Sequence, residues 1–432
     1  MSVPRQIVFR REPLPALSVL EREWRSLEAA GHPSFFTSWR WIGTLLVALP
    51  PPARPQLLRG TGEGKTVALA LLGASETRRR YGLVRSRGLH VNETGDPRFD
   101  SLTVEHNGIL TAATYEPVIW DELLAWFANR PDEADALHVS GSLLCLPAEA
   151  LRRYGLACSQ TAVPSYSAEL ARMAETSIGV HPGLSANARQ QLRRAFRHFE
   201  GVGPLSLREA ASVEEAFAFF AAMKTLHCAS WERRGKSHSF SGPFFEPFHR
   251  LLIERNFAEG GVQLLRALAG DRVIGYLYNF RLGNRIYAYQ SGFDDADQRE
   301  RPGYVTHALA MQHAFRSGAQ VYDFMAGHNR LKESFATRCE PMIWQVVQQP
   351  RLDFRLEALA RRFKHALTAA RRNDSASAAV NALPPVIRTA EERENHDDPA
   401  DRRCRVYRLP RRPQAAGAWR AGLGHRQPQR IL

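Results

Sequence analysis

The stretch Tyr322-Asp-Phe-Met-Ala-Gly-His-Asn-Arg-Leu-Lys-Glu-Ser-Phe335 decides the fold, because it joins a strand pattern, a glycine turn and a lysine. Lys332 is one of five lysines among 58 lysine and arginine residues. In a chain so rich in arginine, a lysine after a strand and a glycine favours a need for a compact ammonium group rather than a planar guanidinium. We therefore expect Lys332 to lie in a binding site.

The length and composition fit two domains with a substantial core, since the chain has 432 residues, of which 44% are hydrophobic and 24% charged. The longest apolar run, around residues 67–72, is far shorter than the roughly 20 residues of a membrane span. Charge returns within residues 1–12, too early for a secretory signal, so we expect a cytoplasmic protein. The five cysteines are scattered and lack ligand spacing with histidines, so we expect neither a disulfide framework nor a metal site.

Much of the net charge of +14 lies at the C-terminal end, where residues 402–432 hold nine arginines and no acidic residue. Such a segment could contact RNA or an anionic membrane surface through phosphate neutralisation. The alternative is a solvated tail without a specific partner. We expect an amphipathic helix over 351–372, followed by a basic, largely disordered tail over 373–432.

The pattern between residues 185 and 325 predicts a mixed, mostly antiparallel sheet flanked by helices, in the α/β (α+β) class. Helices are expected from Ser185, over 213–231 and over 303–316, and strands over 262–268, 273–282, 285–293 and 320–325. Alternation in the middle strand predicts that Ile274, Tyr276, Tyr278, Phe280 and Leu282 share one face. Residues 1–165 mix short helical and strand patterns, and the Ser, Gly and Pro residues over 166–184 indicate a linker.

A candidate anion site lies where the strand pattern over 287–294 ends and residues 299–304 lead into a helix. The first turn of a helix presents free backbone N–H groups and the positive end of the helix dipole. A pyrophosphate would fit there, although Pro302 near the first helical position explains a plain helix start equally well. The residues expected to bind the anion are Lys332, Arg299, Arg301, Gly303 and Tyr304.

Together, these segments resemble the GNAT-superfamily acyltransferases of the FemAB-like and CelD-like branch over roughly residues 180–340. The resemblance is carried by Leu226-His227, Trp231, Arg234-Gly235, Ser291-Gly-Phe-Asp294, Pro302-Gly303, Tyr322-Asp-Phe324, Gly327, Lys332 and Phe335. The chain departs from the family's phosphate-binding loop, in which a glycine is followed two positions later by a second small residue. Here only Gly303 is present, and Val305 stands in place of the second small residue.

The resemblance implies two tandem GNAT-like modules, with a degenerate first module over 1–165 and an acyltransferase module over 185–350. It also implies an acyl-CoA co-substrate, with acetyl-CoA the first candidate, and cofactor-binding roles for Gln290 and Gly292 on the strand beside it. No metal is expected. The acceptor would be an amine or hydroxyl of a sugar-derived or small metabolite, in exopolysaccharide or envelope biosynthesis. Two alternatives remain open: FemAB-like transfer of an aminoacyl group from charged tRNA, and a catalytically degenerate module that acts as a binding or scaffold protein.

Acyl transfer needs a base that removes a proton from the attacking amine or hydroxyl. The candidates are Asp323, His328 and Tyr289, and the expected substrate-binding residues are Trp231, Arg234 and Asp294. Each has a structural alternative. Asp323 could form an ion pair with an arginine, His328 could simply be exposed in its loop, and Tyr289 could serve in strand packing. Trp231 and Arg234 could belong to a helix end that Gly235 caps.

Overall fold

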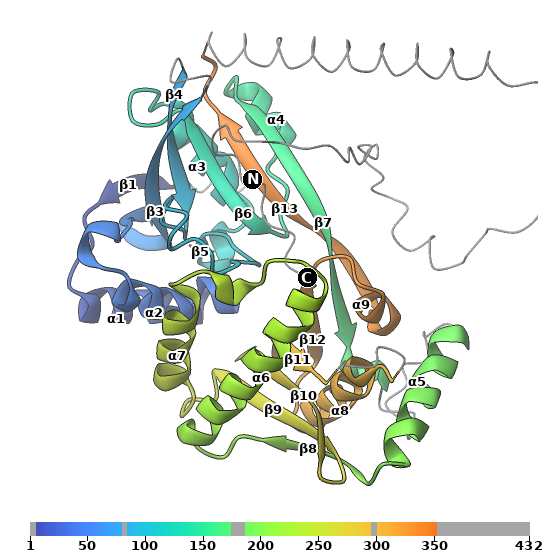
Figure 1. Ribbon diagram of the computed structural model, residues 1–432. Helices are drawn as coiled ribbons and strands as arrows, with labels where there is room; N and C mark the ends of the chain where they lie inside the picture. Colours follow the sequence, from blue (N-terminus) through green and yellow to red (C-terminus); the bar gives the residue numbers. More distant parts are fainter. Residues whose placement is uncertain (1–5, 80–83, 174–185, 295–299, 352–432) are drawn as a thin grey trace, which may run out of the picture.

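The computed structural model describes residues 6–79, 84–173, 186–294 and 300–351 (Figure 1). The predicted helix over 351–372, apart from Arg351, and the predicted tail over 373–432 lie outside these ranges. Within them, no helix combines the length and apolar character that a bilayer crossing requires. The same ranges contain no group of three or more side chains arranged to hold a metal ion.

The first half of the chain begins with a strand and two helices. Its elements are β1 (Val8–Glu12), α1 (Leu17–Ala30), α2 (Trp39–Ala48), β2 (Gln56–Gly62), β3 (Lys65–Arg79), β4 (Val84–Val91), α3 (Ile119–Ala128), β6 (Ala136–Ser142), α4 (Ala148–Arg153) and β7 (Ala157–Glu169). A short strand, β5 (Leu110–Thr111), pairs with β3 at the side of the main sheet.

The second half repeats this order of elements. After α5 (Ala186–Glu200) come β8 (Leu205–Glu209), α6 (Val213–Arg233), α7 (Phe245–Asn256), β9 (Val262–Ala269), β10 (Arg272–Leu282), β11 (Arg285–Phe293), α8 (Pro302–Arg316), β12 (Val321–Ala326), α9 (Arg330–Phe335) and β13 (Arg338–Gln348). Both halves therefore run strand, two helices, three strands, helix, strand, short helix, strand. This internal repeat confirms the predicted architecture of tandem GNAT-like modules in a mixed, mostly antiparallel sheet.

All the described strands belong to one sheet, and its order shows that the two halves exchange their last strands. The order is β1-β2-β3-β4-β6-β13-β7-β12-β11-β10-β9-β8, so β13 pairs with β6 and β7 pairs with β12. The two exchanged strands pair with each other over 157–167 against 338–348, which is the whole of β13 and all but the last two residues of β7. Neither half can therefore complete its sheet without a strand from the other.

The linker predicted over 166–184 is wrong in its first part, because β7 continues to Glu169 and a short helical turn follows over 170–173. Residues 165–169 pair with β12. Of the Ser, Gly and Pro residues over 166–184, Ser167 belongs to this strand and the others lie outside the described residues. Earlier in the same strand, Pro164 lies opposite Pro341 of β13. Two prolines facing each other lack two ladder donors, and the carbonyl of Pro164 instead accepts the N–H of Gly327 at 2.7 Å.

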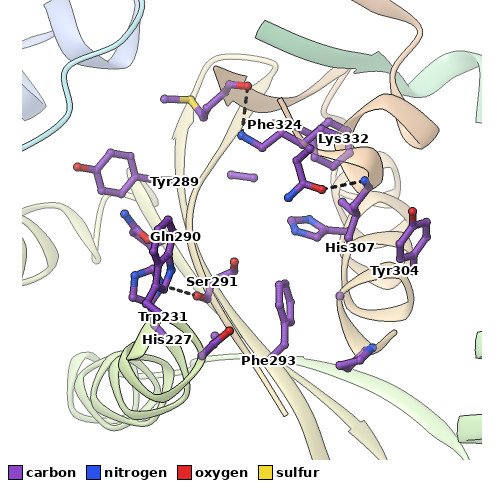
Figure 2. Close-up of a pocket in the computed structure, with 18 of the residues that line it drawn as sticks. His227, Trp231, Tyr289, Gln290, Ser291, Phe293, Tyr304, His307, Phe324 and Lys332 are labelled. Atoms are coloured by element: carbon purple, nitrogen blue, oxygen red, sulfur yellow. Dashed lines mark hydrogen bonds between the residues drawn. The ribbon is translucent and has the colours of Figure 1, made fainter. Parts of the chain in front are cut away.

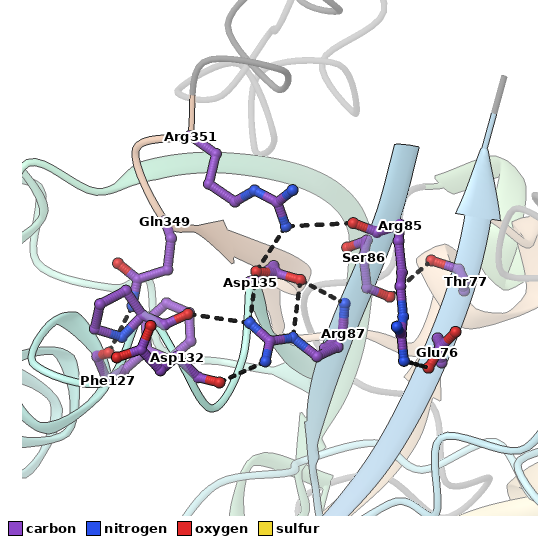
Figure 3. Close-up of polar contacts among 11 residues, drawn as sticks. Glu76, Thr77, Arg85, Ser86, Arg87, Phe127, Asp132, Asp135, Gln349 and Arg351 are labelled. Carbon is purple, nitrogen blue, oxygen red and sulfur yellow. Dashed lines mark hydrogen bonds and ion pairs between the residues drawn. The ribbon is translucent and has the colours of Figure 1, made fainter. Parts of the chain in front are cut away.

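The far end of β13 is fastened to the first half by polar contacts (Figure 3). The Gln349 side chain donates to the carbonyl of Phe127 at 2.7 Å, and Arg351 lies 2.8 Å from a carboxylate oxygen of Asp135. Asp135 is buried, and its carboxylate also accepts the backbone N–H of Arg87 in β4 at 2.8 Å. The residues that follow β13 are thus hydrogen-bonded to residues of the first half.

Elements of the second half follow the predicted pattern closely. Ser212 caps α6 by accepting the N–H of Glu215, and the three strands β9, β10 and β11 form the predicted meander. The predicted shared face of β10 is wrong at Ile274, which belongs to a different core cluster from Tyr276, Tyr278 and Phe280. A register shift between Val273 and Gly275 causes this, because a bulge reverses the faces of the residues beyond it.

One aromatic core is shared by the two halves. Phe35, next to α2, stacks on Phe280 of β10 with ring centroids 4.4 Å apart and planes 10° from parallel. Trp41 of α2 packs against both Phe280 and Phe248 of α7. The two halves therefore bury hydrophobic surface in common and should unfold together.

A buried ion-pair cluster joins the halves a second time. Asp323 of β12, only 2% exposed, accepts from Arg285 of β11 at 2.7 Å and lies 3.1 Å from the Nε2 atom of His106 in the first half. Its other oxygen accepts the N–H of Met325 at 2.8 Å. Burial alone would raise the pKa of Asp323, but the charges of His106 and Arg285 lower it below its usual value.

The shared aromatic core gives a first prediction. Phe280→Ala should lower the free energy of unfolding by about 3–5 kcal/mol, since it empties a fully buried site between the halves. Phe315→Ala, on the outer face of α8 where the side chain is 39% exposed, should cost less than about 1 kcal/mol. Urea denaturation followed by circular dichroism measures both, and equal losses would contradict a core shared by the two halves.

The ion-pair cluster gives a second prediction. Asp323→Asn should lower the free energy of unfolding by about 3–5 kcal/mol at pH 7, because it leaves the buried His106 and the partly buried Arg285 without their counter-charge. The matched control is Asp294→Asn, which breaks the half-exposed pair with Arg272 and should cost less than about 1 kcal/mol. Because the pKa of Asp323 is lowered in the folded state, its contribution is present above the unfolded pKa of about 3.9 and is lost as the pH falls below that value. If the difference in unfolding free energy between the wild type and Asp323→Asn already shrank between pH 7 and pH 5, the lowered pKa of Asp323 would be contradicted.

Candidate functional site

A cleft opens where β11 and β12 separate. Their parallel pairing covers only residues 285–287 against 321–323, and beyond it the two strands diverge. The cleft has a volume of about 350 Å³ and is bounded by α6, the end of β11, the first turns of α8, the end of β12 and α9. Figure 2 shows His227, Trp231 and Gln290 on one side of it, His307 and Tyr304 on the other, and Lys332 near the end of β12. Two residues of the first half, Thr103 and Glu105, also line it.

Gly292 lets β11 pass close to α6 at the edge of the cleft. A Cβ atom added there would lie 2.3 Å from the carbonyl oxygen of Met223 in α6. Any side chain would therefore push the helix away from the strand. Gly292 lines the cleft, as expected for a cofactor-binding position, and its packing against α6 is a sufficient reason for a glycine.

The first turn of α8 faces the cleft. Arg301 precedes the helix in the left-handed conformation, with φ 58°, and its guanidinium donates to the side chain of Gln191 in α5. A Cβ atom on Gly303 would lie 3.2 Å from side-chain atoms of Leu331 and Phe293, so this position is tightly enclosed. The backbone N–H groups of a first helical turn and the helix dipole together attract an anion. This end of the cleft can therefore hold a phosphate group, with Arg301 beside it.

Lys332 is a half-buried residue of α9. Its ammonium donates to the carbonyl of Ala326 at 2.7 Å and reaches that of Met325 at 3.5 Å (Figure 2). Burial lowers the pKa of Lys332 to about 8, although the negative charges of Glu105 and Asp323 oppose the change. The lysine can therefore exist in either protonation state near neutral pH.

Glu105 is the acidic residue of the cleft. It lies in the loop between β4 and β5, is 6% exposed, and accepts the backbone N–H of Ala326 at 2.7 Å. Burial raises the pKa of Glu105, and the positive charge of Lys332 opposes that rise. Glu105 was not predicted, because it lies in the half of the chain without a catalytic motif, and only the folded chain brings it to the second half.

Two histidines of the cleft were also not predicted as site residues. The Nδ1 atom of His227 lies 2.9 Å from the carbonyl of Ser291, so Nδ1 carries the hydrogen and Nε2 keeps its lone pair. That Nε2 has no hydrogen-bond partner among the described residues, and burial lowers the pKa of His227 to about 4. His307 contacts the Tyr322 hydroxyl at 3.0 Å, and burial followed by the charge of Lys332 lowers its pKa to about 3. The sequence signal for His307 was available, since it follows Gly303 by one helical turn.

Most of the predicted site residues come together here. The ones that line the cleft are Tyr289, Gln290, Gly292, Arg301, Gly303, Tyr304, Lys332, Trp231 and Arg234. Tyr289 is an unsuitable base, because its hydroxyl donates to the carbonyl of Leu102 and burial raises its pKa well above the usual value. Arg299 lies outside the described residues.

Three predicted residues lie away from the cleft lining. Asp323 sits in the buried ion-pair cluster, which favours the structural alternative over a role as the base. His328 is 77% exposed and pairs with Glu333 at 2.9 Å. Asp294 pairs with Arg272 at 2.8 Å and does not reach the cleft. In each case the charged side chain forms an ion pair with a neighbouring residue, and its position on the strand or loop lies outside the cleft lining.

Residues 186–333 are similar to a known domain family. This range matches the model of the acetyltransferase (GNAT) domain family. No curated protein sequence matches the chain. Among solved structures, FemX aligns with a TM-score of 0.50 at 9% identity, covering 78% of this chain and 96% of FemX.

Two further solved structures align less closely. The C-terminal domain of a putative lysylphosphatidylglycerol synthetase from Agrobacterium fabrum gives a TM-score of 0.45 at 13% identity, covering 80% of this chain and 95% of that domain. A tandem GNAT protein from the clavulanic acid biosynthesis pathway gives 0.41 at 12% identity, covering 80% and 100%. The fold of the described chain is similar to that of FemX, and residues 186–333, which contain most of the cleft lining, match the acetyltransferase (GNAT) domain family, which supports a transferase.

Proposed function

We propose that the protein transfers an acyl group from acyl-CoA to an amine or hydroxyl in the cleft between β11 and β12. The observation that carries this proposal is the position of the cleft. It lies at the split between two parallel strands, inside the segment that matches the acetyltransferase family, and the start of α8 with Arg301 closes one end of it. An anion site next to a strand edge suits a thioester carried by a pyrophosphate-bearing molecule.

The donor would lie along β11. Its pyrophosphate would bind the N–H groups at the start of α8 and the guanidinium of Arg301, with Gly303 keeping the first turn close to its neighbours. The acyl end would then run beside residues 289–292, where backbone N–H groups on the diverging edge of β11 could polarise the thioester carbonyl. Acetyl is the acyl group we favour, on the strength of the family match.

The reaction needs two proton transfers. The nitrogen or oxygen of the acceptor attacks the thioester carbon, its proton goes to a base, the C–S bond breaks, and the thiolate of CoA leaves and takes up a proton. Lys332 suits the second step, since its pKa of about 8 is close to that of an ordinary thiol, about 8.5. Proton exchange between groups of similar pKa is efficient.

The acceptor site would lie on the side of the cleft formed by Trp231, Gln290 and Tyr289. These residues offer flat apolar surfaces next to amide and hydroxyl groups, which suits a sugar-derived or small-metabolite acceptor. The CelD-like resemblance of the motifs supports a role in exopolysaccharide or envelope biosynthesis. A donor of the coenzyme A type supports a cytoplasmic site of action.

A second candidate function is the transfer of an aminoacyl group from charged tRNA. Its support comes from α5, where Arg193, Arg194 and Arg197 are exposed on the face opposite the core. Gln191 of the same helix contacts Arg301 at the cleft. An RNA acceptor stem could follow this basic face, and its binding would then fall steeply with salt concentration.

A purely structural role of the second half is less favoured. Glu105 is buried and Lys332 is half-buried, and taking charged groups out of water costs folding free energy unless they are well paired. A scaffold protein has no need to keep such groups at the wall of a cavity, whereas an acyltransferase does.

The proposed donor gives a third prediction. Acetyl-CoA should bind the wild-type protein with micromolar affinity in calorimetric titration at moderate salt. Arg301→Ala should weaken binding about tenfold or more, since it removes a charge-assisted hydrogen bond worth about 1.5–3 kcal/mol. Arg316→Ala, at the opposite end of α8, is the matched control and should bind as the wild type does. Tight binding of charged tRNA with no detectable heat from acetyl-CoA would favour the second candidate instead.

The protonation state of Lys332 gives a fourth prediction. If the ammonium donates the proton to the leaving thiolate, turnover should decline as the pH rises through about 8, because the ammonium is lost above its pKa. Lys332→Met should remove this decline and slow the reaction at pH 7. Lys224→Met, which breaks the half-exposed pair with Glu246, is the control and should leave the pH profile unchanged. An identical alkaline decline in the Lys332 variant would exclude this role for the lysine.

A further inference from the structure

We propose that Glu105, which belongs to the first half of the chain, is the general base of the cleft in the second half. The proposal rests on the acyl transfer proposed above and makes the site a composite of both halves. It gives the first half, which lacks a catalytic motif of its own, a direct part in the chemistry.

The position of Glu105 is the first argument. One carboxylate oxygen accepts the N–H of Ala326, while the Lys332 ammonium donates to the carbonyl of the same residue, each at 2.7 Å. Glu105 and Lys332 thus bind the peptide groups on the two sides of Ala326, a residue in the wall of the cleft. Among the described residues, no backbone N–H donates to the second carboxylate oxygen of Glu105, and we assign this oxygen to the contact with an acceptor in the cleft.

The loop that carries Glu105 is rigidly held. Thr103 and His106, on either side of Glu105, both have left-handed backbone conformations, with φ of 52° and 50°. Gly141 of β6 makes room for the loop, since a Cβ atom there would lie 2.3 Å from the carbonyl oxygen of Val104. Left-handed residues other than glycine cost free energy and occur often at functional sites, where the surrounding structure imposes them.

The same loop closes the corresponding split in the first half. Strands β4 and β6 pair in parallel over 88–90 against 136–138, as β11 and β12 do in the second half. Beyond this pairing, Asn107 bridges the two strands: its N–H donates to the carbonyl of Gly141 at 3.0 Å and its side chain donates to that of Val91 at 2.8 Å. The loop therefore occupies the split of its own half and presents Glu105 to the split of the other.

The surroundings of Glu105 suit a base. Burial raises its pKa, which strengthens it as a proton acceptor, while Lys332 keeps the carboxylate form accessible. The other candidates are weaker: the pKa of His227 is lowered to about 4, that of His307 to about 3, and Tyr289 keeps its proton in a hydrogen bond.

The proton balance closes within this pair. The acceptor forms its bond to the thioester carbon and gives its proton to the free oxygen of Glu105. The C–S bond breaks, and the thiolate takes a proton from the ammonium of Lys332. Glu105 then returns its proton to the neutral lysine, so that acyl-CoA and the acceptor have become the acylated acceptor and free CoA thiol.

The test follows thiol release from acetyl-CoA in the full-length protein, with glucosamine as the acceptor probe and water as the background acceptor. Glu105→Gln should lower turnover by about 100-fold or more, the range expected for loss of a general base. The affinity for acetyl-CoA should stay within about twofold, because a glutamine oxygen can still accept the N–H of Ala326. Glu116→Gln, an exposed glutamate of the same half that pairs with His32, is the matched control and should turn over as the wild type does.

A second variant separates a base from a merely structural group. In Glu105→Ala, added formate should restore turnover at least tenfold, since it can occupy the vacated space and accept the proton, and thermal unfolding confirms that the variant is folded. A folded Glu105→Ala that does not respond to formate, or a Glu105→Gln that turns over within threefold of the wild type, would overturn this role of Glu105 and leave the proposed function intact. A wild-type protein that binds no acetyl-CoA and releases no thiol would overturn the proposed function itself.

Discussion

The exchange of β7 and β13 is the constraint on which the rest of the structure depends. Each strand completes the sheet of the opposite half, and the two pair with each other over 157–167 against 338–348. This exchange fixes the position of β12, which ends at the cleft, and so fixes the peptide groups of Ala326 that Glu105 and Lys332 contact. The site in the second half therefore belongs to a continuous hydrogen-bonded sheet that includes the strands of the first half.

Charged groups lie in two layers around the end of β12, one with a structural role and one at the cleft. The deeper layer, Asp323 with His106 and Arg285, is fully paired and lies away from the cleft, as a structural cluster should be. The layer at the cleft, Glu105 and Lys332, uses backbone groups as partners and keeps bonding capacity for a ligand. Between the layers, Met325 has a left-handed backbone with φ of 64°, which the side chain of Asp323 supports through its N–H. The paired layer thus stabilises the strained turn that the cleft requires.

Local patterns in the sequence predicted much of the second half, and the reasons for the failures are physical. Helix caps and alternation are short-range signals, so α6, α8 and the meander were predicted within a few residues. The start of the expected linker is a strand, which local patterns did not reveal because its partners β12 and β13 lie more than 150 residues further along the chain. The sequence could not show that Asp323 is a structural acid and Glu105 an acid of the cleft. That distinction depends on which residue of the other half lies beside each of them.

The internal repeat explains why a first half without a motif can still matter to the chemistry. Two copies of one module create two splits in the sheet, and a single long loop between β4 and β5 closes the first split while it reaches the second. A loop anchored by a filled split is more rigid than one that ends in solvent, and rigidity is what a base needs to hold a fixed position against its substrate. The same segment, 92–109, therefore fills the split of the first half and supplies an acidic group to the cleft of the second half.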